Sequence, residues 1–291
     1  MQVICIGNPT LGGAGKTPAA IAIGERLKRD GKKVFFLTRG YGGSETGPLL
    51  IDLSKHDARA IGDEAPLLAA IAPTVVAHDR AAGAKLAGEN GADVLLMDDG
   101  FQNPSLEKDF SILVVDGSRG VGNGLVFPAG PLRAPLDVQL EYTHAMVVIG
   151  DGEAGEKAAR LASEHRVSVF RARLDPDSAS SAELKGERVL AFAGIGAPEK
   201  FFRSLDEAGA IVAERVSFGD HHRYTETDAT DLIAKAKAGA LKLVTTEKDL
   251  TRMQGNTKLS MLREQCNVLR VRLAFENENG FFAAIKSSGV G

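Results

Sequence analysis

Residues 10–17 constrain this chain more than any other stretch, because their sequence fits one local structure. They read Thr-Leu-Gly-Gly-Ala-Gly-Lys-Thr. The apolar residues 3–6 before them predict a buried strand. Pro18 after them predicts a helix start, since proline at the first helical position costs no hydrogen bond. A strand, a glycine-rich turn and a helix in this order predict a phosphate-binding loop (P-loop), in which backbone amides and the helix N-terminus meet an anion.

We expect this loop to bind ATP through Thr10, Leu11, Gly12, Gly13, Ala14, Gly15, Lys16 and Thr17. Lys16 is expected to reach the β- and γ-phosphates, and the Thr17 hydroxyl to bind Mg²⁺. The strict motif has glycine where this chain has Thr10, so Gly12 and Gly13 are expected to supply the bend. The alternative is an ordinary glycine-rich turn with a surface lysine. The Gly-Lys-Thr triplet at the helix start favours phosphate binding.

The composition indicates a globular chain of two domains. It has 291 residues, a net charge of −3 and 33 glycines, an excess typical of tight turns between strands and helices. The charge gives no reason to expect nucleic acid as a partner. Cys5 and Cys266 have no metal-binding spacing, so we expect a reducing compartment, the cytoplasm. No apolar run approaches the roughly 20 residues that span a bilayer.

Short apolar runs alternate with helical segments along the chain. Expected strands cover residues 3–6, 34–37, 74–77, 94–97, 110–116 and 145–149, then 189–193, 211–216, 241–244 and 268–273. Expected helices cover residues 62–72, 79–90, 198–208, 227–238 and 279–285. This alternation predicts an α/β fold with a parallel sheet covered by helices on both faces. Segment 175–182 is small and polar, so we predict a P-loop ATP-binding lobe at 1–174, a linker at 175–186 and a smaller α/β lobe at 187–291.

Asp98 and Asp99 end an apolar strand, where a P-loop enzyme places a carboxylate that binds Mg²⁺. The alternative is a solvated pair at a loop start, but adjacent carboxylates after a buried strand repel unless a cation is near. Gln102 follows within reach of the same metal. We therefore expect all three residues at a magnesium site.

Two further acidic groups are ambiguous from the residues alone. Gly62-Asp63-Glu64 opens an expected helix, where acidic residues commonly serve as simple caps. Asp220-His221-His222 follows a strand, and its histidines are a metal site, a base or surface residues of a turn. No third ligand at zinc spacing lies nearby.

Two loops carry weaker signals. Gly194 and Gly196 follow a strand, with Glu214 twenty residues after Gly194, but the third glycine of a dinucleotide-binding motif is absent. Arg133 ends a loop rich in proline and glycine at 128–133. It is either a phosphate or substrate clamp or an exposed side chain.

An ordered set of short stretches runs from residue 7 to residue 249. They read Gly-Asn (7–8) with Gly-Gly-Ala-Gly-Lys-Thr-Pro (12–18), Arg-Gly-Tyr-Gly-Gly (39–43), Gly-Asp-Glu-Ala-Pro (62–66), Asp-Asp-Gly-Phe-Gln (98–102), Pro-Ala-Gly-Pro-Leu-Arg (128–133), Asp-His (220–221) and Thr-Thr-Glu-Lys-Asp (245–249). In this set the chain resembles the tetraacyldisaccharide 4′-kinase family, the lipid A 4′-kinases. Each stretch alone is weakly specific, but their order is highly specific.

The resemblance implies transfer of the γ-phosphate of ATP to the 4′-hydroxyl of a membrane-embedded tetraacylated glucosamine disaccharide 1-phosphate, a late step of lipid A biosynthesis. It implies two α/β lobes with the site in the cleft between them. It also implies that Asp63 is the base, paired with His221. Together with Lys16 of the P-loop and Arg133, these are the residues we expect to act in catalysis. The residues implied near Mg²⁺ are Thr17, Glu64 and Gln102, beside Asp98 and Asp99.

The chain departs from this family in three places. Ala134 stands where glutamate is usual, and Asn103 where histidine is usual. The family usually has an N-terminal amphipathic segment that contacts the membrane, whereas Met1 here lies just before the first expected strand. We therefore expect only weak peripheral association with the cytoplasmic face of the inner membrane. The expected partner is an acylated disaccharide lipid, the substrate, and no obligate protein partner is expected.

A second function, from another class, is a P-loop ATPase that switches a protein partner and has no small-molecule acceptor. The candidate base residues favour the kinase. So do the basic side chains Lys16, Arg39 and Arg133, because phosphoryl transfer depends on positioning and charge neutralisation. ATP turnover with and without an acylated disaccharide separates the two functions.

Overall fold

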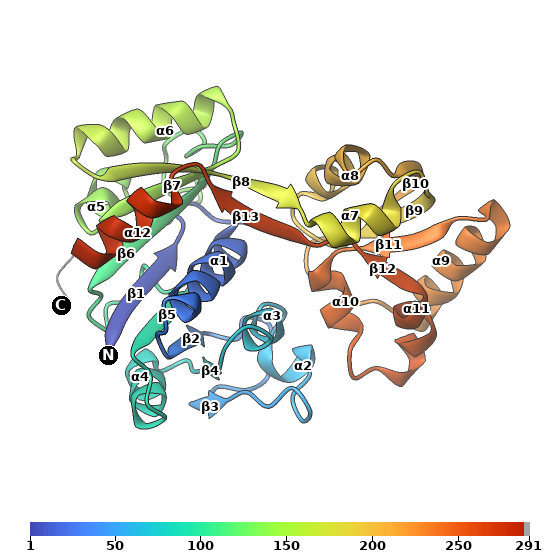
Figure 1. Cartoon of the computed structure of the whole chain (residues 1–291), viewed down its shortest axis with the longest axis horizontal. Helices are drawn as coiled ribbons and strands as arrows, with labels where there is room; N and C mark the ends of the chain where they lie inside the picture. Colours follow the sequence, from blue (N-terminus) through green and yellow to red (C-terminus); the bar gives the residue numbers. More distant parts are fainter. Residues whose placement is uncertain (288–291) are drawn as a thin grey trace.

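Two β-sheets divide the computed structural model, which describes residues 1–287, into a larger and a smaller lobe (Figure 1). The larger lobe is built on a nine-stranded sheet. Its strands are, in spatial order, β13 (Val271–Phe275), β8 (Ser168–Pro176), β7 (Ala145–Ile149), β6 (Phe110–Asp116), β1 (Gln2–Gly7), β5 (Val94–Asp98), β2 (Val34–Thr38), β4 (Thr74–Val76) and β3 (Leu49–Leu50). All neighbouring pairs are parallel except the outermost, β13 with β8 and β3 with β4. The predicted parallel sheet is therefore confirmed, with an antiparallel strand at each edge.

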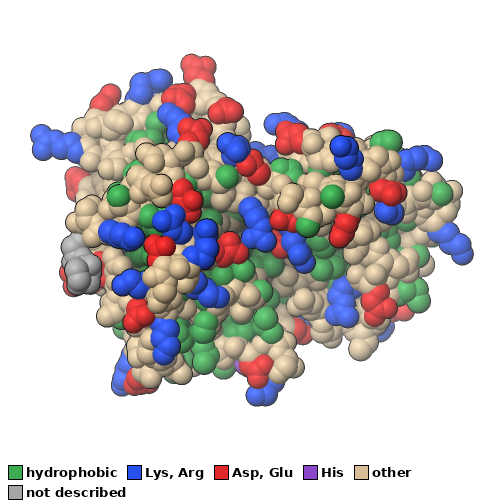
Figure 2. Space-filling view, viewed as in Figure 1, with side chains coloured by type: hydrophobic (Ala, Val, Ile, Leu, Met, Phe, Trp, Pro, Cys, Tyr) green, Lys and Arg blue, Asp and Glu red, His purple; other side chains and the backbone are tan. Residues whose placement is uncertain are grey.

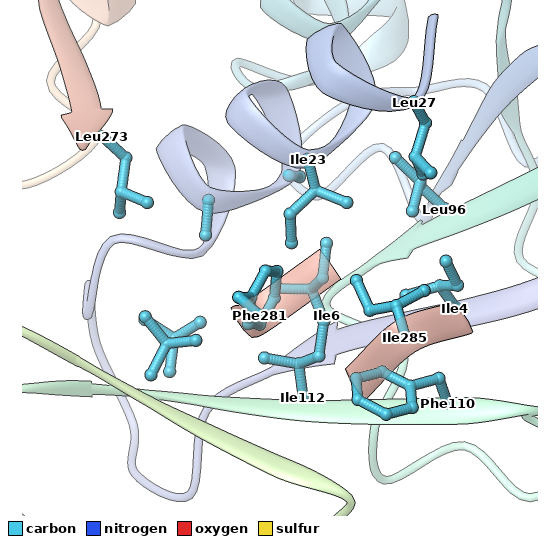
Figure 3. Packing of buried hydrophobic residues seen from close by; sticks show 14 of the residues in the cluster. Ile4, Ile6, Ile23, Leu27, Leu96, Phe110, Ile112, Leu273, Phe281 and Ile285 are labelled. Atoms are coloured by element: carbon cyan, nitrogen blue, oxygen red, sulfur yellow. The ribbon is translucent and has the colours of Figure 1, made fainter. Parts of the chain in front are cut away.

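Helices cover both faces of this sheet. They are α1 (Lys16–Arg29), α2 (Ala58–Ile61), α3 (Ala65–Ala69), α4 (Arg80–Glu89), α5 (Leu136–Glu141), α6 (Glu153–Glu164) and α12 (Glu278–Ser287). Successive residues of β1 belong to different core clusters: Ile4 and Ile6 pack with α1 and α12, whereas Val3 and Cys5 pack with α4 and α6. Figure 3 shows the first cluster, with Ile23 of α1 facing the sheet. Burial on both faces is why the central strands read as continuous apolar runs.

The smaller lobe is a four-stranded parallel sheet in the order β10 (Ile211–Ser217), β9 (Arg188–Ala193), β11 (Lys242–Thr245) and β12 (Cys266–Val268). Its helices are α7 (Ser178–Leu184), α8 (Pro198–Glu207), α9 (Glu226–Gly239), α10 (Glu247–Met253), α11 (Ser260–Gln265) and a short 3₁₀ helix, η1 (Thr257–Leu259). Helix α10 contacts α2 and α3 of the larger lobe and carries residues of the site described below.

Two predicted boundaries were wrong. The segment predicted as a linker, 175–186, contains the end of β8 and helix α7, which Asp177 caps by accepting from the Ser180 amide. Residues 268–273 are also not one strand: β12 belongs to the smaller sheet, and β13 pairs with β8 in the larger one. The smaller lobe therefore does not extend to residue 291, because β13 and α12 return to the larger lobe (Figure 1).

The helix predicted at 62–72 is interrupted. Gly62 has a φ of 83° and ends α2, and α3 begins only after Glu64. A Cβ atom on Gly62 would approach Tyr41 O to 2.5 Å, so no other residue fits there without movement. Asp63 and Glu64 therefore lie in the turn between the two short helices.

Among residues 1–287, no helix has both the length and the apolar content required to cross a bilayer. On the face shown in Figure 2, basic and acidic side chains are intermixed over both lobes.

Candidate active site

The loop between β1 and α1 holds its lysine close to the sheet. Gly15 has a φ of 90°, a conformation that glycine adopts without strain, and it precedes the first residue of α1. The amine of Lys16 donates to Asn8 Oδ1 at 2.9 Å and lies 3.7 Å from Asp99 Oδ1. Burial lowers the pKa of Lys16, and the carboxylates of Asp99 and Asp98 oppose that shift. The contacts with Asn8 and Asp99 hold the amine at the loop, where a phosphate would meet it.

Helix α1 begins two residues earlier than expected. It starts at Lys16, so Pro18 is the third helical residue and not the first. Proline is tolerated there because the amides of the first turn have no intrahelical acceptor.

Asp98 is the buried carboxylate of the site. It ends β5, and its Oδ2 accepts from the Thr17 hydroxyl at 3.3 Å. Its other oxygen, Oδ1, is buried and has no hydrogen-bond partner among the described residues. Burial raises the pKa of Asp98 to about 6, and nearby Lys16 opposes the shift. An unpartnered carboxylate oxygen beside a hydroxyl is a donor set that suits Mg²⁺, which binds one or two protein oxygens and completes its shell with water and phosphate.

Glu64 and Gln102, the other residues expected near the metal, have partners of their own. Glu64 Oε1 accepts from Lys248 of the smaller lobe at 2.8 Å. Burial acts to raise the pKa of Glu64, but the charge of Lys248 outweighs it and the pKa falls below its usual value. Gln102 Nε2 donates to Asn8 O at 3.3 Å and to Gln139 Oε1 at 3.2 Å. Glu64 is close enough to raise the pKa of Asp98, so these groups share one electrostatic environment.

Asp99 faces basic side chains. Its φ of 57° turns it out of the strand direction, and its Oδ2 accepts from Arg133 Nη2 at 3.3 Å. Arg133 Nε donates to Thr10 O at 3.1 Å, and Leu11 N donates to Pro131 O at 2.8 Å. The loop that ends in Arg133 is therefore attached to the P-loop, and Arg133 lies against Thr10 of that loop.

Asp63 meets the smaller lobe directly. Its Oδ2 lies 2.8 Å from His221 Nδ1, although the two residues are 158 positions apart. His221 has a φ of 57° and an edge-on contact with the Tyr41 ring at a centroid distance of 5.6 Å. A left-handed backbone at a non-glycine residue is strained, and such strain persists where the surrounding structure holds it. A carboxylate and an imidazole from opposite lobes thus form a hydrogen-bonded pair where the lobes meet.

Comparison with known proteins identifies the family. The family model described as tetraacyldisaccharide-1-P 4′-kinase matches residues 1–289. The chain belongs to this family. It is 49% identical over 278 residues to the tetraacyldisaccharide 4′-kinase of Rhodopseudomonas palustris (strain BisB5), covering 96% of this chain and 82% of that protein. It is 50% identical over 276 residues to that of Methylorubrum extorquens (strain PA1), covering 95% and 82%.

A solved structure of the family has the same fold. The crystal structure of LpxK from Aquifex aeolicus in complex with ATP matches with a TM-score of 0.75 and 26% sequence identity, covering 99% of this chain and 88% of that chain. The α/β fold predicted from the sequence is thereby confirmed.

The 4′-kinase fold brings most of the predicted site residues together, in two groups. Lys16, Thr17, Asp98, Asp99 and Arg133 gather around the P-loop through the contacts given above. Asp63, Glu64 and His221 gather where the lobes meet. His222 does not join them, because its Nε2 pairs with Asp228 Oδ2 at 3.1 Å at the start of α9.

Two residues that contact this site were missed by the sequence reasoning. Lys248 contacts Glu64, and Arg252 Nε donates to Asp63 Oδ2 at 2.7 Å. Lys248 lies in a stretch that matches the family, but no role was assigned to it, and Arg252 lies just beyond that stretch. A usable signal was the spacing of Asp249 and Arg252, which places opposite charges three residues apart on one helical face.

Proposed function

We propose that this protein is the ATP-dependent kinase that phosphorylates the 4′-hydroxyl of a tetraacylated glucosamine disaccharide 1-phosphate. The observation that carries the proposal is the Asp63–His221 pair, which joins the two lobes next to Glu64, and the charge of Glu64 in turn acts on Asp98. A P-loop that only hydrolyses ATP to switch a partner has no need of a carboxylate–imidazole pair from a second lobe. Family membership supports the choice of acceptor.

Asp63 is the proposed base. As the acceptor oxygen attacks the γ-phosphorus, its proton passes to Asp63 Oδ1, the new O–P bond forms, and the bond from the γ-phosphorus to the β-γ bridging oxygen breaks. ADP leaves with that oxygen. His221 orients the carboxylate through Oδ2, as the third member of a triad orients its base.

Lys16 and Arg133 are the proposed charge-neutralising residues. Both lie against Asp99, at the phosphate side of the site. Positive charge placed in advance around a transferring phosphoryl group stabilises the transition state more than the ground state. Asp99 holds both cations in place, although it was expected at the metal.

Thr17 and Asp98 are the residues that would hold Mg²⁺, with Glu64 and Gln102 nearby. When bound, the ion neutralises charge on the β- and γ-phosphate oxygens.

The acceptor is a lipid, so we place the protein at the cytoplasmic face of the inner membrane, where ATP is available. We propose that it associates weakly and needs its lipid substrate or anionic lipid to do so. Flotation with neutral liposomes that contain no substrate should leave most of the protein in solution, whereas tight binding to such liposomes would contradict weak association.

The decisive experiment measures ATP turnover and product identity with and without the tetraacylated disaccharide 1-phosphate. A kinase releases ADP in proportion to a product with a second phosphate, at the 4′ position. ADP release that does not depend on the lipid would reject the kinase and favour the switch ATPase.

A further inference from the structure

Arg252 is a buried cation that crosses from the smaller lobe to Asp63. It lies on α10, and its side chain is only 4% exposed. Its Nε donates to Asp63 Oδ2 at 2.7 Å, and its Nη1 donates to Asp249 Oδ1 at 2.8 Å and to Gly194 O at 2.5 Å. Asp249 has no exposed surface, so the arginine is anchored in its own lobe before it meets Asp63.

We propose that Arg252 is a positioning residue for phosphoryl transfer: with His221 it fixes Asp63 Oδ2, so that Oδ1 is presented to the acceptor hydroxyl. The inference rests on the proposed function, in which Asp63 is the base.

The choice of oxygen is the central observation. His221 Nδ1 and Arg252 Nε both contact Oδ2, at 2.8 and 2.7 Å. Within residues 1–287, no donor contacts Oδ1, and the Asp63 side chain keeps 16% of its surface exposed. Two partners on the same oxygen restrain the position of the carboxylate. One oxygen is therefore held and the other faces outward, the arrangement required for proton transfer in a defined direction.

Gly194 places the two donors relative to each other. This residue follows β9 and belongs to the glycine pair that only weakly suggested a dinucleotide site. Its carbonyl accepts from the His221 amide at 3.1 Å as well as from Arg252, and its own amide donates to Asp249 Oδ1 at 3.1 Å. A Cβ atom here would come within 2.9 Å of His222 Cβ and 3.2 Å of Asp249 Oδ1. A side chain at this position would push against both neighbours, so glycine allows the close packing in which its backbone holds His221 and Arg252.

A role in stability alone explains these contacts less well. Arg252 Nη2 is buried with no hydrogen-bond partner among the described residues, which costs free energy. Burying an ion pair also yields little net stability compared with apolar packing. Arginine keeps its proton at any working pH, so it can orient the base without competing for the acceptor's proton.

The test compares Arg252→Met, Arg252→Lys and Asp63→Asn, alone and combined, with Arg215→Met as control. Arg215 pairs with Asp206 at 3.0 Å on the surface of the same lobe, so its loss should change neither rate nor fold. Arg252→Met should lower kcat by ~10–100-fold through misplacement of the base and leave the KM for ATP within about twofold. Arg252→Lys keeps the charge but cannot reach all three partners, so it should recover part of the loss.

The combined variants decide between positioning and general stability. In an Asp63→Asn background, Arg252→Met should cost little more, because residues that act as one unit are not additive. Full multiplication of the two losses would overturn the inference, and so would an unchanged kcat in Arg252→Met. If Arg252→Met does not fold, Arg252→Lys with and without Asp63→Asn gives the same decision. If Asp63→Asn alone retains activity, the proposed base is wrong, whatever the Arg252 variants do.

Discussion

The two halves of the site differ in how the chain builds them. At the phosphate-binding half, Lys16 contacts Asn8, eight positions away, and the surrounding residues belong to the larger lobe. At the base-bearing half, Asp63 contacts His221 and Arg252, which are 158 and 189 positions away in the other lobe. The first half forms whenever the larger lobe folds. The second half exists only when the two lobes are packed together, so under the proposed mechanism catalysis depends on their contact.

The largest expected effect comes from breaking the base-bearing half. Asp63→Asn and His221→Ala should each lower kcat by about 10²–10⁴-fold, the usual contribution of a positioned base, with ATP binding nearly unchanged. The double variant should be little worse than the worse single variant. Steady-state kinetics and ATP titration check this. Loss of Mg·ATP binding in Asp63→Asn would instead make Asp63 a metal ligand.

Breaking the phosphate-binding half should cost somewhat less. Lys16→Ala removes a cation that faces the transferring phosphoryl group, so kcat should fall by roughly 10²–10³-fold while the fold survives. The measurement is turnover of the purified variant, with circular dichroism as the control for folding. Near-normal turnover by a folded variant would show that the loop is not a P-loop in function.

Asp98 provides a test of stability, because its charge is buried in the folded protein. Burial raises the pKa of Asp98 from 3.8 to about 6, so the folded protein favours the protonated carboxyl over the carboxylate. The stability that this preference contributes is complete below about pH 4 and is lost as the pH rises through 6. Asp98→Asn should therefore be more stable than the wild type at pH 7.5 by on the order of 2–3 kcal/mol in EDTA without nucleotide, and nearly equal at pH 4. Urea unfolding at the two pH values measures this. A variant less stable at pH 7.5 would mean that the hydrogen bond from Thr17 outweighs the buried charge.

The smallest effect concerns another contact between the lobes. Lys200 of α8 donates to Asp116 Oδ2 at the end of β6. Burial acts to raise the pKa of Asp116, but the bonds from Lys200 and Ser118 outweigh it and hold the pKa below its usual value. The stability that the ionised Asp116 contributes to the folded protein is therefore present above about pH 4 and is lost as the pH falls further. Lys200→Met should cost about 0.5–1 kcal/mol at pH 7, since the lysine is half exposed, and nothing at low pH. An equal loss at both pH values would assign the cost to packing.

The same comparison explains which parts the sequence could predict. The loop between β1 and α1 and the position of Asp98 beside it could be predicted from residue order alone, because their geometry depends on neighbouring strands, one turn and one helix. Asp63 read as a helix cap until the family resemblance assigned it a role, and Arg252 was not found. Neighbours along the chain say nothing about a partner 189 positions away. The prediction of one strand at residues 268–273 was wrong for a related reason. The end of β12 and the start of β13 are both extended and rich in apolar residues, and only their non-local pairing assigns them to different sheets.

The return of β13 to the larger sheet makes the smaller lobe an insertion. The chain leaves the larger lobe after β8 and re-enters at β13, and these strands are antiparallel neighbours with Val271 opposite Pro176. The Asp177 amide donates to Arg270 O at 2.8 Å, so the exit and entry points already touch. Residues 178–269 could therefore be excised and the ends joined by a short turn without stretching the remaining sheet. The product would be a minimal nucleotide-binding module that lacks His221 and Arg252, and it would separate ATP binding from phosphoryl transfer within a single polypeptide.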